Sequence, residues 1–226
     1  MHTLLYSDTV VNVNKQRLTR LESQQRTRVK LVEAAERVFV RAGFDAASVE
    51  HIAASAGFTR GAFYSNFKSK DEIFLALLDR RRIDSETALN AIFQAKRDAH
   101  ARFRAARDWY ADQWRQRNWS VLEAEFNLCA LRQRSLAKRL SALWRQEVEA
   151  YSAFLAQYFS DAGLTPAENP RAITLALLAA AKGFGMLALL PSGAVIESTI
   201  AHSSALTFNR LVPAPPAAKR GRKKKG

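Results

Sequence analysis

Hydrophobic positions along this chain recur mostly at the three-to-four-residue spacing of amphipathic helices. A clear stripe runs from Leu31 to Ala42, and no strand-like alternation of useful length appears anywhere. The pattern and its breaks predict helices from about Leu31 to Ala42, over 49–56 and 59–66, after Ser69, and over roughly 85–116, 119–134, 136–161, 170–190 and 195–211. The sequence therefore predicts an all-α fold with about nine helices.

Capping residues locate several of these boundaries. Gly43 and Gly57 stand where left-handed residues close helices, and Ser48 and Thr59 stand where hydroxyl groups open them. Ser69 to Glu72 has the spacing of a capping box. Residues 1–22 lack helical periodicity, so we expect a flexible arm there.

Charge points to the kind of partner. Lys and Arg total 35 against 21 Asp and Glu, a formal charge of +14. Both ends are basic, and the last stretch contains six bases and no acid between Lys219 and Lys225. Such an excess favours a polyanionic partner, either nucleic acid or an anionic membrane surface.

Residues 48–66 hold two short predicted helices joined by a tight glycine turn, the spacing of a helix-turn-helix. Ile52, Ala53 and Phe63 would pack this pair onto the first long helix. The start of the second helix would then face outward, with Thr59, Arg60, Gly61, Ala62, Tyr64 and Ser65. In this motif the second helix enters the DNA major groove and its first residues meet base edges.

The outward residues suit that role. Arg60 can make a bidentate contact to guanine, while Gly61 and Ala62 allow close approach and a methyl contact to thymine. Phosphate contacts are expected from hydroxyl groups, a phenol and an ammonium group, those of Ser48, Thr59, Tyr64 and Lys70. Pairs of small surface helices with this shape also occur in enzymes. Under that alternative interpretation, residues 48–66 bind no ligand.

Three stretches together carry a specific resemblance: Gly43-Phe44, then Ser48 to Ala53, then Ala56 to Glu72. They closely resemble the DNA-binding domain of TetR-family regulators, over about residues 26–75. The resemblance implies a homodimeric repressor that a small ligand releases from a palindromic operator. It assigns Ser48, Thr59, Tyr64 and Lys70 to phosphate and Arg60 to a base. The long N-terminal arm and the basic tail depart from the family.

The resulting division of the chain is a basic arm (1–22), a helix-turn-helix domain (23–70), a helical effector-binding and dimerisation domain (71–212) and a disordered basic tail (213–226). The third segment is rich in aromatic rings, which can line an apolar pocket or simply pack a core. The candidate effector-binding residues are Trp109, Trp114, Trp119, Phe126, Trp144 and Phe184. Dimerisation is expected through helices at about 170–190 and 195–211, because the first is too apolar to face water.

The sequence gives less support to an enzyme, a metal site or a membrane protein. The chain lacks a phosphate loop and the common hydrolase motifs, and its four histidines lack ligand spacing, so we expect neither an enzyme nor a metal or cofactor. Ala172 to Leu190 is long enough to cross a bilayer, but Lys182 near its middle favours the central helix of a soluble bundle. One cysteine and the absence of a signal peptide favour the cytoplasm.

The tail leaves two interpretations open. Arg220-Gly221-Arg222 could lie in an A·T-rich minor groove like an AT-hook, although Lys223 replaces the usual proline. A nonspecific polycation is the alternative. More broadly, an architectural protein that coats DNA through its basic arms, or an enzyme or carrier that uses the helical domain, remains as an alternative to a ligand-released repressor.

Overall fold

A computed structural model describes residues 19–95, 98–189 and 193–216. These residues form helices and no strand, which confirms the all-α expectation. The helices are α1 (Arg20–Ala42), α2 (Val49–Ser55), α3 (Arg60–Tyr64), α4 (Lys70–Ala95), α5 (Ala99–Gln113), α6 (Arg117–Arg132), α7 (Arg134–Ala162), α8 (Pro170–Leu187) and α9 (Gly193–Leu211).

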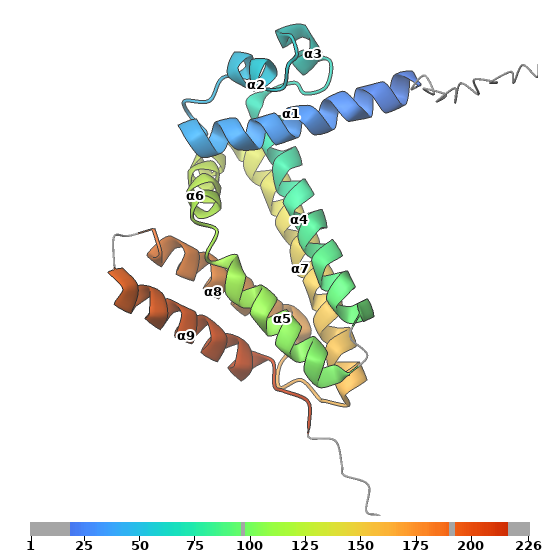
Figure 1. Ribbon diagram of the computed structural model, residues 1–226, viewed down its shortest axis with the longest axis vertical. Coiled ribbons are helices and arrows are strands. Elements are labelled where there is room, and N and C mark those ends of the chain that lie inside the picture. Colours follow the sequence, from blue (N-terminus) through green and yellow to red (C-terminus); the bar gives the residue numbers. More distant parts are fainter. Residues whose placement is uncertain (1–18, 96–97, 190–192, 217–226) are drawn as a thin grey trace, which may run out of the picture.

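The helices form two parts, which we call the head (α1–α3) and the body (α4–α9). In Figure 1, α1 lies across the upper ends of α4 and α7, with α2 and α3 on its far side. Helices α4 and α7 both run away from the head along one side of the body, and α8 and α9 form an antiparallel pair on the other. Helix α6 rises from the body to α1, so it contacts both parts.

Two boundaries differ from the expectation. Helix α1 begins at Arg20, inside the segment expected to be an arm, because Thr19 and Glu22 form a capping box in which each side chain bonds the other's backbone amide. The expected helix over 85–116 is instead divided between α4 and α5. The Asp98 carboxylate caps α5 by accepting bonds from the amides of His100 and Ala101.

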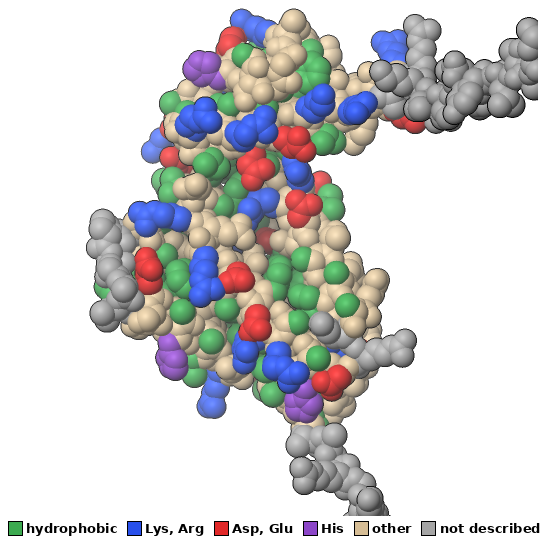
Figure 2. Space-filling view, in the orientation of Figure 1, with side chains coloured by type: hydrophobic (Ala, Val, Ile, Leu, Met, Phe, Trp, Pro, Cys, Tyr) green, Lys and Arg blue, Asp and Glu red, His purple; other side chains and the backbone are tan. Residues whose placement is uncertain are grey.

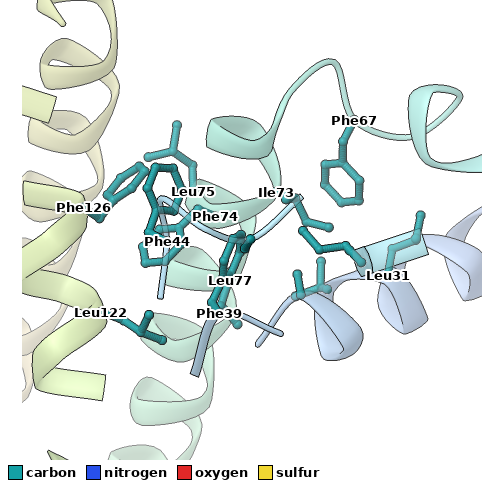
Figure 3. Packing of buried hydrophobic residues seen from close by; sticks show 14 of the residues in the cluster. Leu31, Phe39, Phe44, Phe67, Ile73, Phe74, Leu75, Leu77, Leu122 and Phe126 are labelled. Atoms are coloured by element: carbon teal, nitrogen blue, oxygen red, sulfur yellow. The ribbon is translucent and has the colours of Figure 1, made fainter. Parts of the chain in front are cut away.

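Aromatic rings at the junction of head and body form a cluster that we call the head-side core. Phe39, Phe44 and Phe74 pack with ring centroids 5.1–5.5 Å apart, and Phe126 of α6 stacks on Phe74 at 4.1 Å (Figure 3). Phe63 of α3 is fully buried in the same cluster. The head therefore sits on the body through a continuous apolar contact.

Helix α8 is long and apolar enough to span a membrane by length and composition, and among the described helices it alone meets that criterion. It packs against α7 and α9, and Lys182 pairs with Glu123 of α6. Only 22% of the 18-residue apolar stretch Pro170–Leu187 is buried within one chain. Helix α8 is thus part of the body and still presents an apolar face outward.

Candidate functional site

The two short helices of the head meet at a turn that depends on glycine. Gly57 adopts φ +75°, a left-handed backbone conformation that residues other than glycine adopt only at an energetic cost. The turn lets Ile52, Ala53 and Phe63 bury against α1, as the sequence predicted. The opposite face of α3 stays exposed, and it carries Thr59, Arg60, Gly61, Tyr64 and Ser65, with Ala62 partly covered.

Arg60 is held at the start of α3 by two neighbours. Its Nη1 atom lies 3.1 Å from Oε1 of Glu50 on α2, and its guanidinium lies 5.4 Å from the ring centroid of Tyr64. A hydrogen bond to Tyr64 and the charge of Glu50 raise the pKa of Arg60, so it stays cationic. The group is exposed and points away from the core, where it can exchange Glu50 for a base edge.

The hydroxyl groups proposed for phosphate contacts cap the two short helices. Ser48 Oγ accepts from the His51 amide at 3.1 Å, and Thr59 Oγ1 accepts from the Ala62 amide at 3.2 Å. Lys70 has a further task, because its Nζ donates to the carbonyls of Phe44 and Asp45 at 2.7 and 3.0 Å. Lys70 therefore orders the loop before α2 in addition to any contact with a phosphate.

Arg28 was missed by sequence reasoning, which counted it only as a charge. Its Nη1 donates to the Asn66 carbonyl at 2.7 Å, and its guanidinium lies 4.0 Å from the Phe67 ring centroid. Asn66 Nδ2 in turn donates to the Ala62 carbonyl. Together they fix the C-terminal end of α3, a helix too short to hold itself. The hydrogen bond joins residues 38 apart in the sequence, so no local sequence pattern predicts it.

The body contains a cavity of about 180 Å³ between α4, α5, α6, α7, α8 and α9. Its walls are mainly apolar, and the aromatic residues among them are Phe93, Phe103, Trp109, Tyr110, Trp119, Trp144, Tyr151, Phe154, Tyr158 and Phe208. Three of the expected ligand-binding residues, Trp109, Trp119 and Trp144, line it. The other three lie elsewhere: Phe126 is in the head-side core, Trp114 is buried outside the cavity wall, and Phe184 is on α8 away from it.

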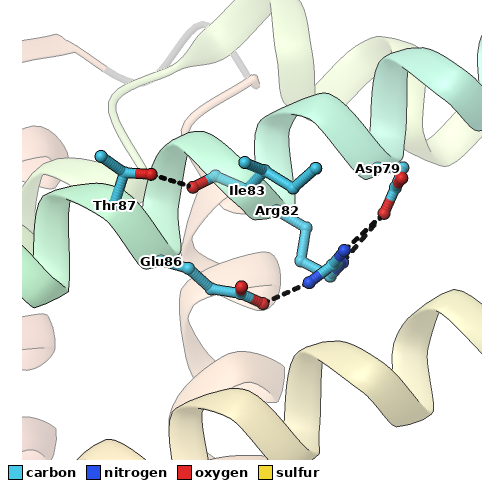
Figure 4. Close-up of polar contacts among 5 residues, drawn as sticks. All are labelled: Asp79, Arg82, Ile83, Glu86 and Thr87. Carbon is cyan, nitrogen blue, oxygen red and sulfur yellow. Dashed lines mark hydrogen bonds and ion pairs between the residues drawn. The ribbon is translucent and has the colours of Figure 1, made fainter.

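Charged side chains also line the cavity, a feature that the sequence did not predict. They are Arg81, Arg82, Glu123, Glu147 and Lys182. Arg82 is held along α4 by Asp79, with Nη2 2.7 Å from Oδ1, and by Glu86 (Figure 4). Lys182 pairs with Glu123. The space is therefore apolar for the most part but contains several fixed charges.

Helix α6 connects this cavity to the head. Trp119 and Glu123 face the cavity, whereas Leu122 and Phe126 lie in the head-side core. Beside them the Phe44 amide donates to Glu125 Oε2 at 2.7 Å. Gly43 permits this approach, because a Cβ there would lie 3.2 Å from both carboxylate oxygens. A displacement of α6 would thus reach the loop that precedes α2.

Exposed side chains distinguish two surfaces. Figure 2 shows Lys and Arg side chains distributed over the head. On the body, large apolar side chains stay exposed on the outer faces of α8 and α9: Leu175, Met186, Leu187, Ile196 and Leu206. These two helices are the ones for which the sequence predicted self-association.

Known proteins match this chain most clearly at the head. The sequence profile of the bacterial regulatory proteins of the tetR family matches residues 31–77. The regulator TtgR of Pseudomonas putida is 47% identical over 58 residues, 26% of this chain and 28% of TtgR. The uncharacterised regulator YwcC of Bacillus subtilis is 27% identical over 134 residues, 55% of this chain and 60% of YwcC. The chain thus spans less than two thirds of either relative.

Solved structures match nearly the whole fold. A putative TetR-family regulator from Mesorhizobium loti superposes with a TM-score of 0.66 at 17% identity, covering 86% of this chain and 97% of that one. FadR of Bacillus subtilis, solved in complex with stearoyl-CoA, gives a TM-score of 0.60 at 15% identity, covering 82% and 98%. Profile, relatives and fold agree, and the chain belongs to the TetR family of helix-turn-helix transcriptional regulators.

Proposed function

We propose that this protein is a homodimeric, cytoplasmic repressor that binds a palindromic DNA operator and leaves it when a small molecule fills the body cavity. The exposed start of α3 carries the proposal. Arg60 stands there beside open backbone at Gly61, on a helix that Arg28 and the head-side core hold rigidly. A short helix so presented fits the major groove, where an arginine reads guanine.

The outer faces of α8 and α9 support the dimer. Leu175 and Leu206 are 59% and 58% exposed in the single chain, and Ala179 and Gly183 between the larger residues of α8 permit close approach. Apolar helix faces of this extent are typical of an interface. Two copies joined there would form a four-helix contact, which gives an operator twofold symmetry.

Helix α6 supports release by a ligand. It lies between the cavity and the Phe44 amide, so a ligand that prefers a displaced α6 also prefers a displaced head. Release requires that preference, because a ligand that binds both arrangements equally shifts neither.

Genome-wide mapping of bound sites, followed by binding of the purified protein to the recovered site and to random DNA, tests the proposal. We expect a preference of at least about a thousandfold for one palindromic site. Equal binding to both DNAs, with a steep salt dependence, would favour an architectural protein instead. Turnover of a cavity ligand would favour an enzyme.

A further inference from the structure

One charged group in the body cavity has no hydrogen-bond or ion-pair partner among the described residues. Glu147 of α7 lines the cavity and makes no hydrogen bond or ion pair of standard geometry with any other described residue. Burial raises the pKa of its carboxyl group, and the charges of Lys182, Arg81 and Arg82 oppose that shift only in part. A partly buried polar group without a hydrogen-bond partner in a cavity is a place where a ligand can supply one.

Each of the other charged groups in the wall makes a polar contact, and that of Arg81 is with an uncharged side chain. Lys182 is bound to Glu123, and Arg82 to Asp79 and Glu86. Arg81 donates to Gln116 and stacks on Trp119, 4.0 Å from the ring centroid. An incoming anion would compete with these contacts and would lie near the Glu147 carboxylate. An incoming cation finds that carboxylate without a hydrogen bond or ion pair, in the field of Lys182, Arg81 and Arg82.

The surroundings of Glu147 also favour a cation. Trp144 and Tyr151 lie three residues before and four residues after it on α7, so they share its face of the helix, and both line the cavity. Trp109 of α5 meets Tyr151 edge-on with ring centroids 6.0 Å apart. Aromatic faces attract cations, most strongly where water is excluded.

Size limits the ligand further. A cavity of about 150 Å³ can hold one benzene-sized molecule, and this one measures about 180 Å³. Tyr110 and Tyr158 present rings rather than free hydroxyls, because their hydroxyl groups donate to the carbonyls of Leu177 and Pro213. Beside these tyrosines, the uncharged polar side chains of the wall are Ser85, Gln113, Ser120 and Thr174, and the remaining uncharged wall residues offer apolar contact.

We infer that the body cavity takes an apolar organic cation of about one aromatic ring, with its ammonium or equivalent charge against Glu147. The inference rests on the proposed use of this cavity as the effector site and names the class of molecule that fits. It assigns Glu147 the role of specificity determinant, which distinguishes a cation from a neutral molecule of the same shape.

Three probes of similar size test it on the full-length protein without DNA. Benzyltrimethylammonium is a permanent cation, neopentylbenzene is its uncharged carbon isostere, and 3-phenylpropanoate is an anion. Fluorescence of Trp109, Trp119 and Trp144 in the cavity wall reports binding. We expect the cation to bind at least about tenfold more tightly than the neutral isostere, and the anion more weakly than either.

Two substitutions locate the preference. Glu147→Gln keeps the shape of the side chain and removes a partly buried charge, so it should fold and should bind benzyltrimethylammonium and neopentylbenzene equally. Glu149→Gln, on the same helix, changes an exposed carboxylate that pairs with Arg171, and it should keep the preference for the cation. Circular dichroism checks that both variants fold.

Two outcomes overturn the inference. The first is a neutral isostere that binds the wild-type protein as tightly as the cation, and the second is a preference that persists in Glu147→Gln. If neopentylbenzene alone binds and releases DNA, the charge assignment fails while the cavity keeps its proposed regulatory role. If no probe binds, both the inference and the cavity's role as effector site for such molecules fail.

Discussion

Aromatic side chains of the head-side core and those around the cavity differ in what they face. Phe39, Phe74 and Phe126 are fully buried against one another, so each ring contacts protein on all sides. Phe103 and Phe208 also pack at 5.7 Å, but both border the cavity. The first arrangement fixes one geometry, and the second leaves space that a ligand can fill.

Polar groups follow the same division. In the head, Arg28 and Lys70 donate to backbone carbonyls and so fix the ends of loops and of α3. In the body, Glu147 keeps a raised pKa and no donor. A DNA-reading surface requires a rigid support, whereas an effector site gains from groups whose partners arrive with the ligand.

Truncation of a ring should cost more in the head-side core than at the cavity. Phe74→Ala should lower the free energy of unfolding by about 3–5 kcal/mol, because the ring leaves a new void among packed neighbours. Phe103→Ala should cost about 2 kcal/mol, since one side of that ring already faces empty space. Urea unfolding of both variants measures the difference, and equal losses would contradict the contrast in packing.

The body should also differ from the head in mediating self-association. Leu175→Glu places a charge in the proposed interface and should weaken dimerisation by about 3 kcal/mol, roughly a hundredfold. Leu131→Glu is the matched control, because Leu131 is 79% exposed on α6, outside that surface. Analytical ultracentrifugation over a range of concentrations distinguishes the variants. An intact Leu175→Glu dimer would place the interface elsewhere.

Base recognition should depend on the rigid head alone. Arg60→Ala should cost about 1–3 kcal/mol of operator affinity and relax the preference at one base pair of each half-site. Lys70→Ala should weaken binding to all sequences alike and lower the salt slope by about one. Fluorescence anisotropy on the operator and on random DNA separates the two effects. A loss for Arg60→Ala that is equal on both DNAs would remove its role in reading bases.

The head was predictable from sequence because its signals are local. Ser48, Gly57 and Thr59 mark the helix ends within a few residues, and the packing of Ile52 and Phe63 follows from helical periodicity. The role of Arg28 was not predicted, because its hydrogen-bond partner lies 38 residues away. The start of α1 was also misplaced, although the capping box of Thr19 and Glu22 is a local signal that could have been recognised.

The cavity was only half predictable, because aromatic composition does not say which ring faces which space. Trp109 and Trp119 line the cavity, but Phe126, on the same helix as Trp119, packs into the head-side core. The orientation of α6 about its own axis decides which side chains face the cavity and which face the head-side core. That orientation depends on contacts with α1 and α4, which are distant in sequence. The lack of a partner for Glu147 depends likewise on six helices together.

Coupling between head and body should weaken without the contact from Glu125. Glu125→Ala removes the carboxylate that accepts from the Phe44 amide. A hydrogen bond of this kind contributes about 1–2 kcal/mol, so the factor by which a cavity ligand lowers DNA affinity should fall about fivefold or more. Operator binding with and without saturating benzyltrimethylammonium measures that factor. An unchanged factor would mean that α6 transmits the signal through its apolar contacts alone.

The basic tail should have the smallest effect on operator binding. Arg220 and Arg222 lie outside the described residues, and their expected DNA contacts stay a prediction. Tyr158 donates to the Pro213 carbonyl, so the chain leaves the body near the end of α7 that is away from the head (Figure 1). From Leu136, in the head-side core, to Tyr158 is about 33 Å along α7, and DNA would lie beyond the head.

Ten residues follow Pro216, and a fully extended chain of that length reaches at most about 36 Å. That reach is close to the distance of about 33 Å between Tyr158 and Leu136, so contact of Arg220 and Arg222 with DNA at the head would require a nearly extended chain. We therefore expect deletion of residues 217–226 to change operator affinity less than about threefold and to leave the salt slope nearly unchanged, because extending the chain to reach the phosphates costs conformational entropy. Titrations at several salt concentrations, on operators flanked by A·T or G·C tracts, measure both quantities. A large loss on A·T flanks alone would support minor-groove contacts and show that the tail does reach the DNA, and equal large losses on both flanks would support a simple polycation.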